Sequence, residues 1–292
     1  PAPRWQGEAL PDGTLLILPE QGVGDELRLM GLVSEAADRA GRTVLAVDER
    51  LVPLAARSFP AIEVRARGTV DESQATRQIP MGSLPAILRA DLDAFPDHAG
   101  YLHPDPQAIA DFRARLKALG PGLAVGIAWT SGLVTARRQG AHGPLEEWEA
   151  VLRTEGIKPV LLQYGPVEDE VRAAEAAFGC TIARWDDLDL KDDLDRVAAL
   201  TAALDLMIAT GSAPAMSPTA RLGDARHRPA PLVPGGAHLP PGARRGLAAA
   251  AGGGGRARAR RAGEGPALLG PAPLDGSPPP GPGSAPSGIR AR

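Results

Sequence analysis

Two acidic residues, Asp25 and Glu26, come directly after the glycine pair Gly22 and Gly24 in the stretch PEQGVGDE. The apolar run TLLIL precedes this stretch and the amphipathic run LRLMGLVSEAADRA follows it, which predicts a turn from a buried strand into a helix. Residues of these types at such a turn suit three roles. They can bind a nucleotide phosphate, cap the helix, or place a carboxylate as a general base.

The phosphate-binding interpretation rests on the dinucleotide fingerprint G-x-G-x-x-G. Gly22 and Gly24 match its first two glycines, and Asp48 ends the next expected strand, where an acid would meet a ribose. Leu27, however, occupies the third glycine position, and carboxylates in the first helical turn would repel a pyrophosphate. A dinucleotide-binding Rossmann enzyme is therefore the disfavoured alternative. Asp25 as a helix cap and Asp25 as a general base both stay open.

The composition is that of an ordinary globular protein. The chain has 292 residues, 43% of them hydrophobic, and a formal net charge of −3, which gives no indication of a nucleic-acid partner. No apolar run approaches the roughly 18 residues of a membrane span, and the first residues lack the features of a signal peptide. The single cysteine, Cys180, has no disulfide partner within the chain and is expected in the core. These features predict a cytoplasmic protein without a transmembrane segment.

Residues 218–292 differ from the rest of the chain. They contain 16 Gly, 14 Pro and 11 Arg, only three acidic residues, and no Phe, Trp, Tyr or Lys. Too few bulky apolar side chains remain to offset an ordering cost of about 1–2 kcal/mol per residue, so disorder is expected. The segment is interpreted as a basic nucleic-acid arm around RARARR (256–261), as a natural disordered extension, or, the favoured explanation, as GC-rich DNA read out of frame.

Upstream of this tail, apolar runs alternate with helical patterns. The runs TLLIL, TVLAV and AIEVRAR predict strands of a first unit, and the helical pattern DPQAIADFRARLKAL ends it. The runs LAVGIAW, PVLLQYG, CTIARW and LMIAT predict strands of a second unit. This alternation predicts an α/β protein of two domains, whose parallel sheets are wound on both faces and face a cleft. The expected boundaries are 1–118, 119–217 for a partial second domain, and 218–292 for the tail.

Five segments occur in the order found in a known enzyme family: WQGEALPDGTLLILPEQGVGDELRLMGLV, YLHPDPQAIADFRARLKALGPGLAVGIAWTSGLVTARR, PLEEWEAVL, LLQYG and DDLDRVAALTAALDLMIATGSAPA. Over residues 5–217 they resemble the glycosyltransferase module found downstream of tetratricopeptide repeats in many bacterial proteins. That module is similar to the family 9 heptosyltransferases of lipopolysaccharide synthesis, and more distantly to protein O-linked N-acetylglucosamine transferases. The resemblance implies a GT-B fold of two Rossmann-like domains. It also implies sugar transfer from a nucleotide-sugar to a protein or glycolipid acceptor. No metal or other cofactor is expected, because no Asp-x-Asp pair lies at a convincing strand end.

The resemblance implies roles for individual residues as well. Asp25 is implied as the base that deprotonates the acceptor hydroxyl, in an acceptor-side loop with Gly22, Gly24 and Glu26. The implied donor-binding residues are Trp129, Thr130, Ser131, Gly132, Arg137, Arg138, Gln163, Tyr164, Gly211 and Ser212. Among these, the arginines would neutralise the diphosphate unless their loop is merely solvated. The pair Gln163 and Tyr164 is equally compatible with core or edge positions.

The chain departs from the family pattern near the last of these residues. Relatives carry an acid before the final turn and a histidine in the next helix, where this chain has Gly211 and Met216. The tail supplies none of the elements that follow in the family, so the donor half is expected to be incomplete and activity is left open. A non-catalytic interaction module is the alternative. The acidic stretch DDLDLKDD (186–193) is expected to be a solvated loop and helix start rather than a metal site.

Overall fold

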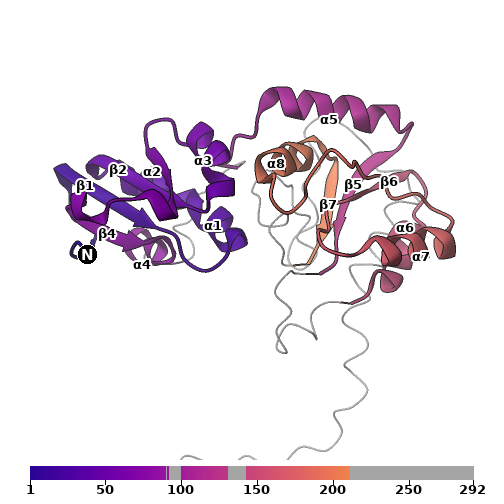
Figure 1. The fold of residues 1–292 in the computed structure, drawn as a ribbon, viewed down its shortest axis with the longest axis horizontal. Coiled ribbons are helices and arrows are strands. Elements are labelled where there is room, and N and C mark those ends of the chain that lie inside the picture. The colour runs from indigo at the N-terminus through magenta and orange to yellow at the C-terminus, as the bar shows by residue number, and fades with distance from the viewer. Residues whose placement is uncertain (90, 92–99, 131–142, 211–292) are drawn as a thin grey trace, which may run out of the picture. The chain divides into compact units, whose positions relative to one another are not determined.

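The computed structural model describes residues 1–89, 91, 100–130 and 143–210 (Figure 1). These residues form two parallel sheets with flanking helices, as the alternating apolar and helical patterns predict. Both sheets belong to one compact unit. The expected tail lies outside the described residues, and the expected division at residues 118 and 119 stays a prediction.

The first sheet has the strand order β3-β2-β1-β4, and all of its pairs are parallel. Its strands are β1 (Leu10–Leu18), β2 (Ala40–Val47), β3 (Glu63–Ala66) and β4 (Arg77–Pro80). Its helices are α1 (Val23–Leu29), α2 (Val33–Ala37), α3 (Val52–Ser58) and α4 (Leu84–Leu88). The helix predicted after the opening turn is interrupted by a 3-10 turn at Met30–Leu32, which separates α1 from α2.

The helices described around the first sheet contribute to a single core on one of its faces. On β1, the side chains of Leu15 and Ile17 belong to this core, whereas Leu16 belongs to a small cluster with Val44 and Ala46. Successive strand residues point to opposite faces, so the small cluster marks the other face. The expectation of helices on both faces is therefore wrong for the described part of this sheet. The connection from β3 to β4 contains only the 3-10 turns Arg67–Thr69 and Glu72–Gln74 among its ordered elements.

The second sheet has the order β6-β5-β7, again with parallel pairs. Its strands are β5 (Leu123–Ala128), β6 (Ile157–Leu161) and β7 (Leu206–Ala209), and its helices are α5 (Pro106–Ala118), α6 (Glu149–Leu152), α7 (Glu168–Phe178) and α8 (Leu194–Ala203). The strand predicted at CTIARW is reduced to an isolated bridge between Ala183 and Val160.

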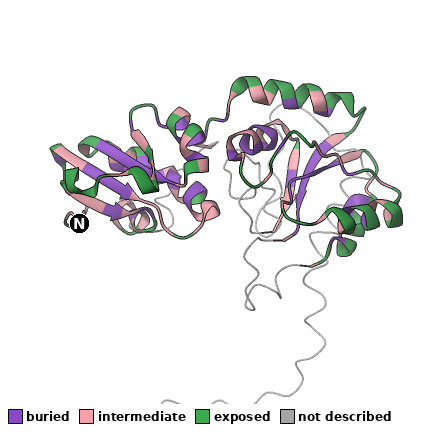
Figure 2. Ribbon diagram, viewed as in Figure 1, coloured by how far each residue is buried: buried purple, intermediate pink, exposed green. Residues whose placement is uncertain are grey.

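Both faces of the second sheet are covered. One core contains Phe112 of α5 and Leu200 of α8, and the other contains Val171 of α7 and Leu152 of α6. Figure 2 shows buried residues concentrated in β1, β2 and β5 and in α8, whereas β3 is only partly buried. This winding on both faces agrees with the prediction from alternating strands and helices. Among the described residues, no helix is long and apolar enough to cross a membrane.

Candidate functional site

The carboxyl ends of β5 and β6 bring together residues that the sequence separates. Trp129 and Thr130 follow β5 directly, and Gln163 and Tyr164 lie just beyond the end of β6. Because the two strands are parallel neighbours, these residues lie at one edge of the sheet. This edge is where open α/β sheets bind ligands.

Gln163 forms hydrogen bonds with the segment that follows β5. Its side-chain oxygen accepts hydrogen bonds from the backbone amides of Trp129 (3.1 Å) and Thr130 (2.9 Å). Its side-chain nitrogen donates to the carbonyl oxygen of Tyr164 at 3.0 Å, and the residue is only 3% exposed. The first two amides after β5 are thus bonded to Gln163 and not open to a ligand phosphate.

Glu170 of α7 makes a second attachment to the same chain segment. One carboxylate oxygen accepts a hydrogen bond from the indole Nε1 of Trp129 at 3.1 Å, and the other accepts one from the backbone amide of Leu145 at 2.5 Å. Trp129 and Leu145 are both buried. Glu170 could not be picked out from the sequence, because it is one of three consecutive acids at the start of α7 and nothing local distinguishes it.

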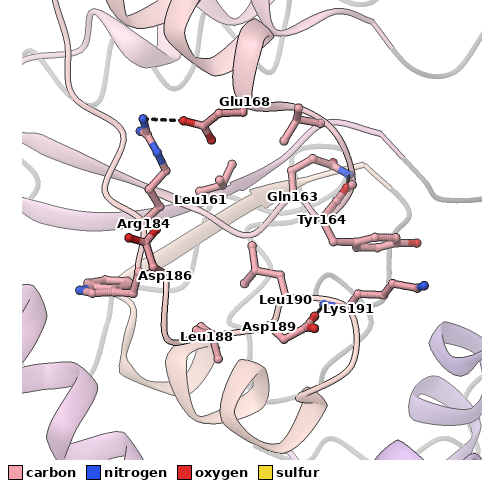
Figure 3. Close-up of a pocket in the computed structure, with 13 residues that line it drawn as sticks. Leu161, Gln163, Tyr164, Glu168, Arg184, Asp186, Leu188, Asp189, Leu190 and Lys191 are labelled. Carbon is pink, nitrogen blue, oxygen red and sulfur yellow. Dashed lines mark hydrogen bonds and ion pairs between the residues drawn. The ribbon is translucent and has the colours of Figure 1, made fainter.

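A pocket of about 360 Å³ opens beside the end of β6 (Figure 3). One wall comes from the segment after β6, including Gln163, Tyr164 and Glu168, and the other from residues 184–191. Figure 3 shows Tyr164 and Lys191 near one another on one side of the pocket and Arg184 with Glu168 on another. Two of the implied donor-binding residues therefore line a real cavity.

The pocket is acidic rather than basic. Glu168, Asp186 and Asp189 contribute carboxylates, and Lys191 and Arg184 contribute cations. Arg184 is already engaged, since it donates to Glu168 at 3.0 Å and also pairs with a further glutamate of α7. A surplus of carboxylates disfavours a diphosphate and favours an uncharged ligand portion that carries hydroxyl donors.

The acidic stretch 186–193 behaves as a loop and helix start, as expected. Asp189 accepts hydrogen bonds from the backbone amides of Asp192 and Lys191, which lower the pKa of its carboxyl. The carboxylate of Asp193 accepts a hydrogen bond of 3.3 Å from the backbone amide of Arg196 and so caps α8. These acids are largely used in building the loop.

At the edge of the first sheet, Asp25 is not the helix cap. The N-cap of α1 is Gly22, and it makes no side-chain capping bond. Asp25 lies in the first helical turn, and its carboxylate pairs with Arg28 at 3.2 Å while remaining 32% exposed. The capping interpretation of Asp25 is therefore wrong. Its carboxylate remains partly open to solvent beside Gly24.

Its neighbour Glu26 is fully buried. One carboxylate oxygen accepts a hydrogen bond of 2.8 Å from the backbone amide of Asp48, and the other accepts one from the guanidinium of Arg67 at 2.5 Å. Burial raises the pKa of Glu26, although the Asp48 amide and the Arg67 charge oppose that shift. Glu26 thereby links the segments that follow β1, β2 and β3.

Asp48 is occupied in a way that counts against the dinucleotide alternative. Its carboxylate accepts hydrogen bonds from the Arg50 side chain at 2.8 and 3.1 Å and from the Arg50 backbone amide at 3.1 Å. These bonds to Arg50 lower the pKa of the Asp48 carboxyl. A ribose at this position would have to displace a charge-assisted pair.

Six implied donor-binding residues lie outside the described residues: Ser131, Gly132, Arg137, Arg138, Gly211 and Ser212. Their roles stay predictions. The cleft expected between two domains likewise stays a prediction.

Comparisons with known proteins show which proteins have a similar sequence or a similar fold. No family model matches the chain. Protein FlbA of Caulobacter vibrioides is 39% identical over 230 residues, which cover 73% of this chain but only 39% of that protein. A family 9 glycosyl transferase from Veillonella parvula has a similar structure, with a TM-score of 0.52 and 12% identity over 75% of this chain and 80% of that one. The E. coli ADP-heptose lipopolysaccharide heptosyltransferase II gives a TM-score of 0.46 at 12% identity, over 68% of this chain and 80% of that chain.

Proposed function

We propose that this protein is a glycosyltransferase of the GT-B type that transfers a sugar from a nucleotide-sugar to a protein or glycolipid acceptor. The observation that carries the proposal is the pocket at the carboxyl edge of the second sheet, with Gln163 and Tyr164 in its wall. The fold similarity to a family 9 glycosyl transferase supports it. The sequence resemblance to the glycosyltransferase module found downstream of tetratricopeptide repeats supports it too, and a cytoplasmic location is part of the proposal.

The residues that line the pocket suggest which part of the nucleotide-sugar binds in it and which part binds elsewhere at this edge of the sheet. The aromatic rings of Tyr164 and Trp185 offer stacking surfaces, and the carboxylates of Asp186 and Asp189 accept hydrogen bonds from hydroxyl groups. These groups suit a nucleoside or sugar. The diphosphate then belongs outside the acidic pocket. In this proposal Arg137 and Arg138 supply the positive charge there.

On the acceptor side, Asp25 is the proposed base. It is the partly exposed carboxylate of the first turn, whereas Glu26 is fully buried and bonded to Asp48 and Arg67. A base within hydrogen-bond reach of the attacking hydroxyl typically contributes about 10² to 10⁴-fold to the rate. At Gly22 a Cβ would meet no heavy atom within 4 Å, which leaves room for an acceptor near this turn.

Ligand binding by the full chain is the first test, because the sequence predicts an incomplete donor half. Calorimetric titration with UDP, GDP and ADP should show saturable binding of at least one of them, and NAD⁺ should not bind. Binding of NAD⁺ alone would support the dinucleotide enzyme. Failure of every nucleotide to bind would support the incomplete donor half expected from the sequence.

A further inference from the structure

Glu170 bonds both ends of the connection between β5 and the 3-10 turn η8 (Leu145–Trp148). The Trp129 indole lies at one end, 3.1 Å from one carboxylate oxygen, and the Leu145 amide lies at the other, 2.5 Å from the second oxygen. A single side chain on α7 therefore bridges these two ends by hydrogen bonds.

The two residues that Glu170 bonds are buried, which stabilises this attachment. Trp129 and Leu145 are 1% and 0% exposed, and both belong to the core that also contains Val171 of α7. Hydrogen bonds to an ionised carboxylate are stronger than neutral ones. Losing Glu170 would leave a buried indole N–H and a buried amide without an acceptor, which is costly.

This attachment reaches the pocket through a short chain of contacts. Glu170 holds the indole of Trp129, the backbone amide of Trp129 is held by Gln163, and Gln163 lines the pocket. Glu170 itself is not among the lining residues. It can affect a ligand in the pocket only by fixing Trp129, whose backbone amide is bonded to Gln163.

We propose that Glu170 is a positioning residue for the nucleotide-sugar, which acts by holding the chain that leaves β5 in register with Gln163. This inference rests on the proposed donor site. It predicts that loss of the Glu170 carboxylate weakens nucleotide binding without any loss of a direct ligand contact.

The variants are chosen to separate positioning from general destabilisation. Glu170→Ala removes both hydrogen bonds. Glu170→Gln keeps one accepting oxygen but places its amide NH₂, which cannot accept a hydrogen bond, next to the other N–H donor. Asp169→Asn makes the same charge change on the same helix at a side chain that is 99% exposed. Val171→Ala lowers stability by truncating a fully buried side chain of α7 while leaving Glu170 in place.

Two measurements on the full chain test whether Glu170 is a positioning residue. Hydrogen exchange, followed by mass spectrometry on a peptide covering residues 143–152, should be faster in both Glu170 variants than in Asp169→Asn. Calorimetry with the tightest-binding of UDP, GDP and ADP should show affinity about tenfold weaker in Glu170→Ala, partly restored in Glu170→Gln, and unchanged in Asp169→Asn and Val171→Ala below their melting temperatures.

The possible failures are distinguishable. Unchanged exchange in Glu170→Ala would show that the carboxylate does not hold Leu145 and would overturn the inference. Faster exchange with unchanged nucleotide affinity would overturn it as well, because the attachment would then be structural only. If the unaltered chain binds none of the three nucleotides, the proposed function fails and the inference falls with it.

Discussion

The buried carboxylate of Glu26 accepts a hydrogen bond of 2.8 Å from the backbone amide of Asp48, which ties the first turn of α1 to the end of β2. The same carboxylate pairs with Arg67 beyond β3. Three loops at the carboxyl edge of the first sheet therefore depend on one side chain. Asp25, the adjacent residue, is held in place by a helix whose first turn is anchored in this way.

The pH dependence of stability should report on Glu26. Burial raises its pKa above the ordinary value of 4.5, so between the unfolded-state and folded-state pKa values the folded protein keeps a proton that the unfolded chain has lost. Unfolding then releases that proton, and the free energy of unfolding falls as pH rises through the folded-state pKa. Glu26→Gln has no proton to release. Urea unfolding between pH 4.5 and 7 should show a flatter dependence for this variant than for the unaltered chain and the exposed control Glu72→Gln.

Asp25→Asn should separate catalysis from structure. Gly22 is the N-cap, so the substitution removes no cap, and the melting temperature should stay nearly constant. An asparagine cannot accept the acceptor proton, so turnover should fall by about 10²-fold or more while nucleotide affinity holds. Turnover is best measured in a relative with a complete donor half. Turnover like that of the unaltered enzyme would rule out Asp25 as the base.

The diphosphate assignment predicts an order of effects on nucleotide affinity. Arg137→Ala and Arg138→Ala together should weaken binding of a nucleoside diphosphate more than Asp25→Asn does, because charge on the phosphates is then less well neutralised. Calorimetric titration of this chain compares the two. The reverse order would move the phosphates to the turn at Gly22 and Gly24 and revive the dinucleotide alternative.

Gly31, in the 3-10 turn between α1 and α2, lies close to the ring of Tyr101, and this contact can be tested by mutation. A Cβ at Gly31 would lie 2.7 Å from a ring carbon of Tyr101, whose hydroxyl lies 2.7 Å from the Leu27 carbonyl oxygen. Gly31→Ala should therefore lower the free energy of unfolding by about 1–3 kcal/mol through overpacking. In a Tyr101→Ala background the ring is gone and the additional cost of Gly31→Ala should largely disappear. Equal costs in both backgrounds, measured by urea unfolding, would contradict this explanation.

The tail gives a prediction that needs no ligand. If residues 218–292 are disordered, trypsin at low concentration should cut at their arginines before it cuts within the first 217 residues. Mass spectrometry of the early fragments locates the cuts. A resistant tail, or a cooperative loss of stability when it is deleted, would count against disorder.

The sequence by itself determined much of the fold, because strands buried on both faces leave continuous apolar runs. The runs TLLIL and TVLAV are confirmed within β1 and β2, and the helix predicted after Pro104 is confirmed as α5. The failures concern contacts that lie far apart along the chain. The segment CTIARW has a strand-like composition but forms one bridge to β6, and no local pattern could say that the β3 to β4 connection lacks a long helix.

For the candidate site, the sequence supplied residue types and only the tertiary structure decided their roles. Asp25 and Glu26 are neighbours in sequence, yet a helix turns by about 100° per residue, so one faces solvent and the other is buried against Asp48. Glu168, Asp169 and Glu170 read alike, but only Glu170 reaches Trp129 and Leu145. Those partners lie 41 and 25 positions away along the chain. Which acid meets them follows from the packing of α7 on the second sheet, and that packing is not encoded in any short stretch.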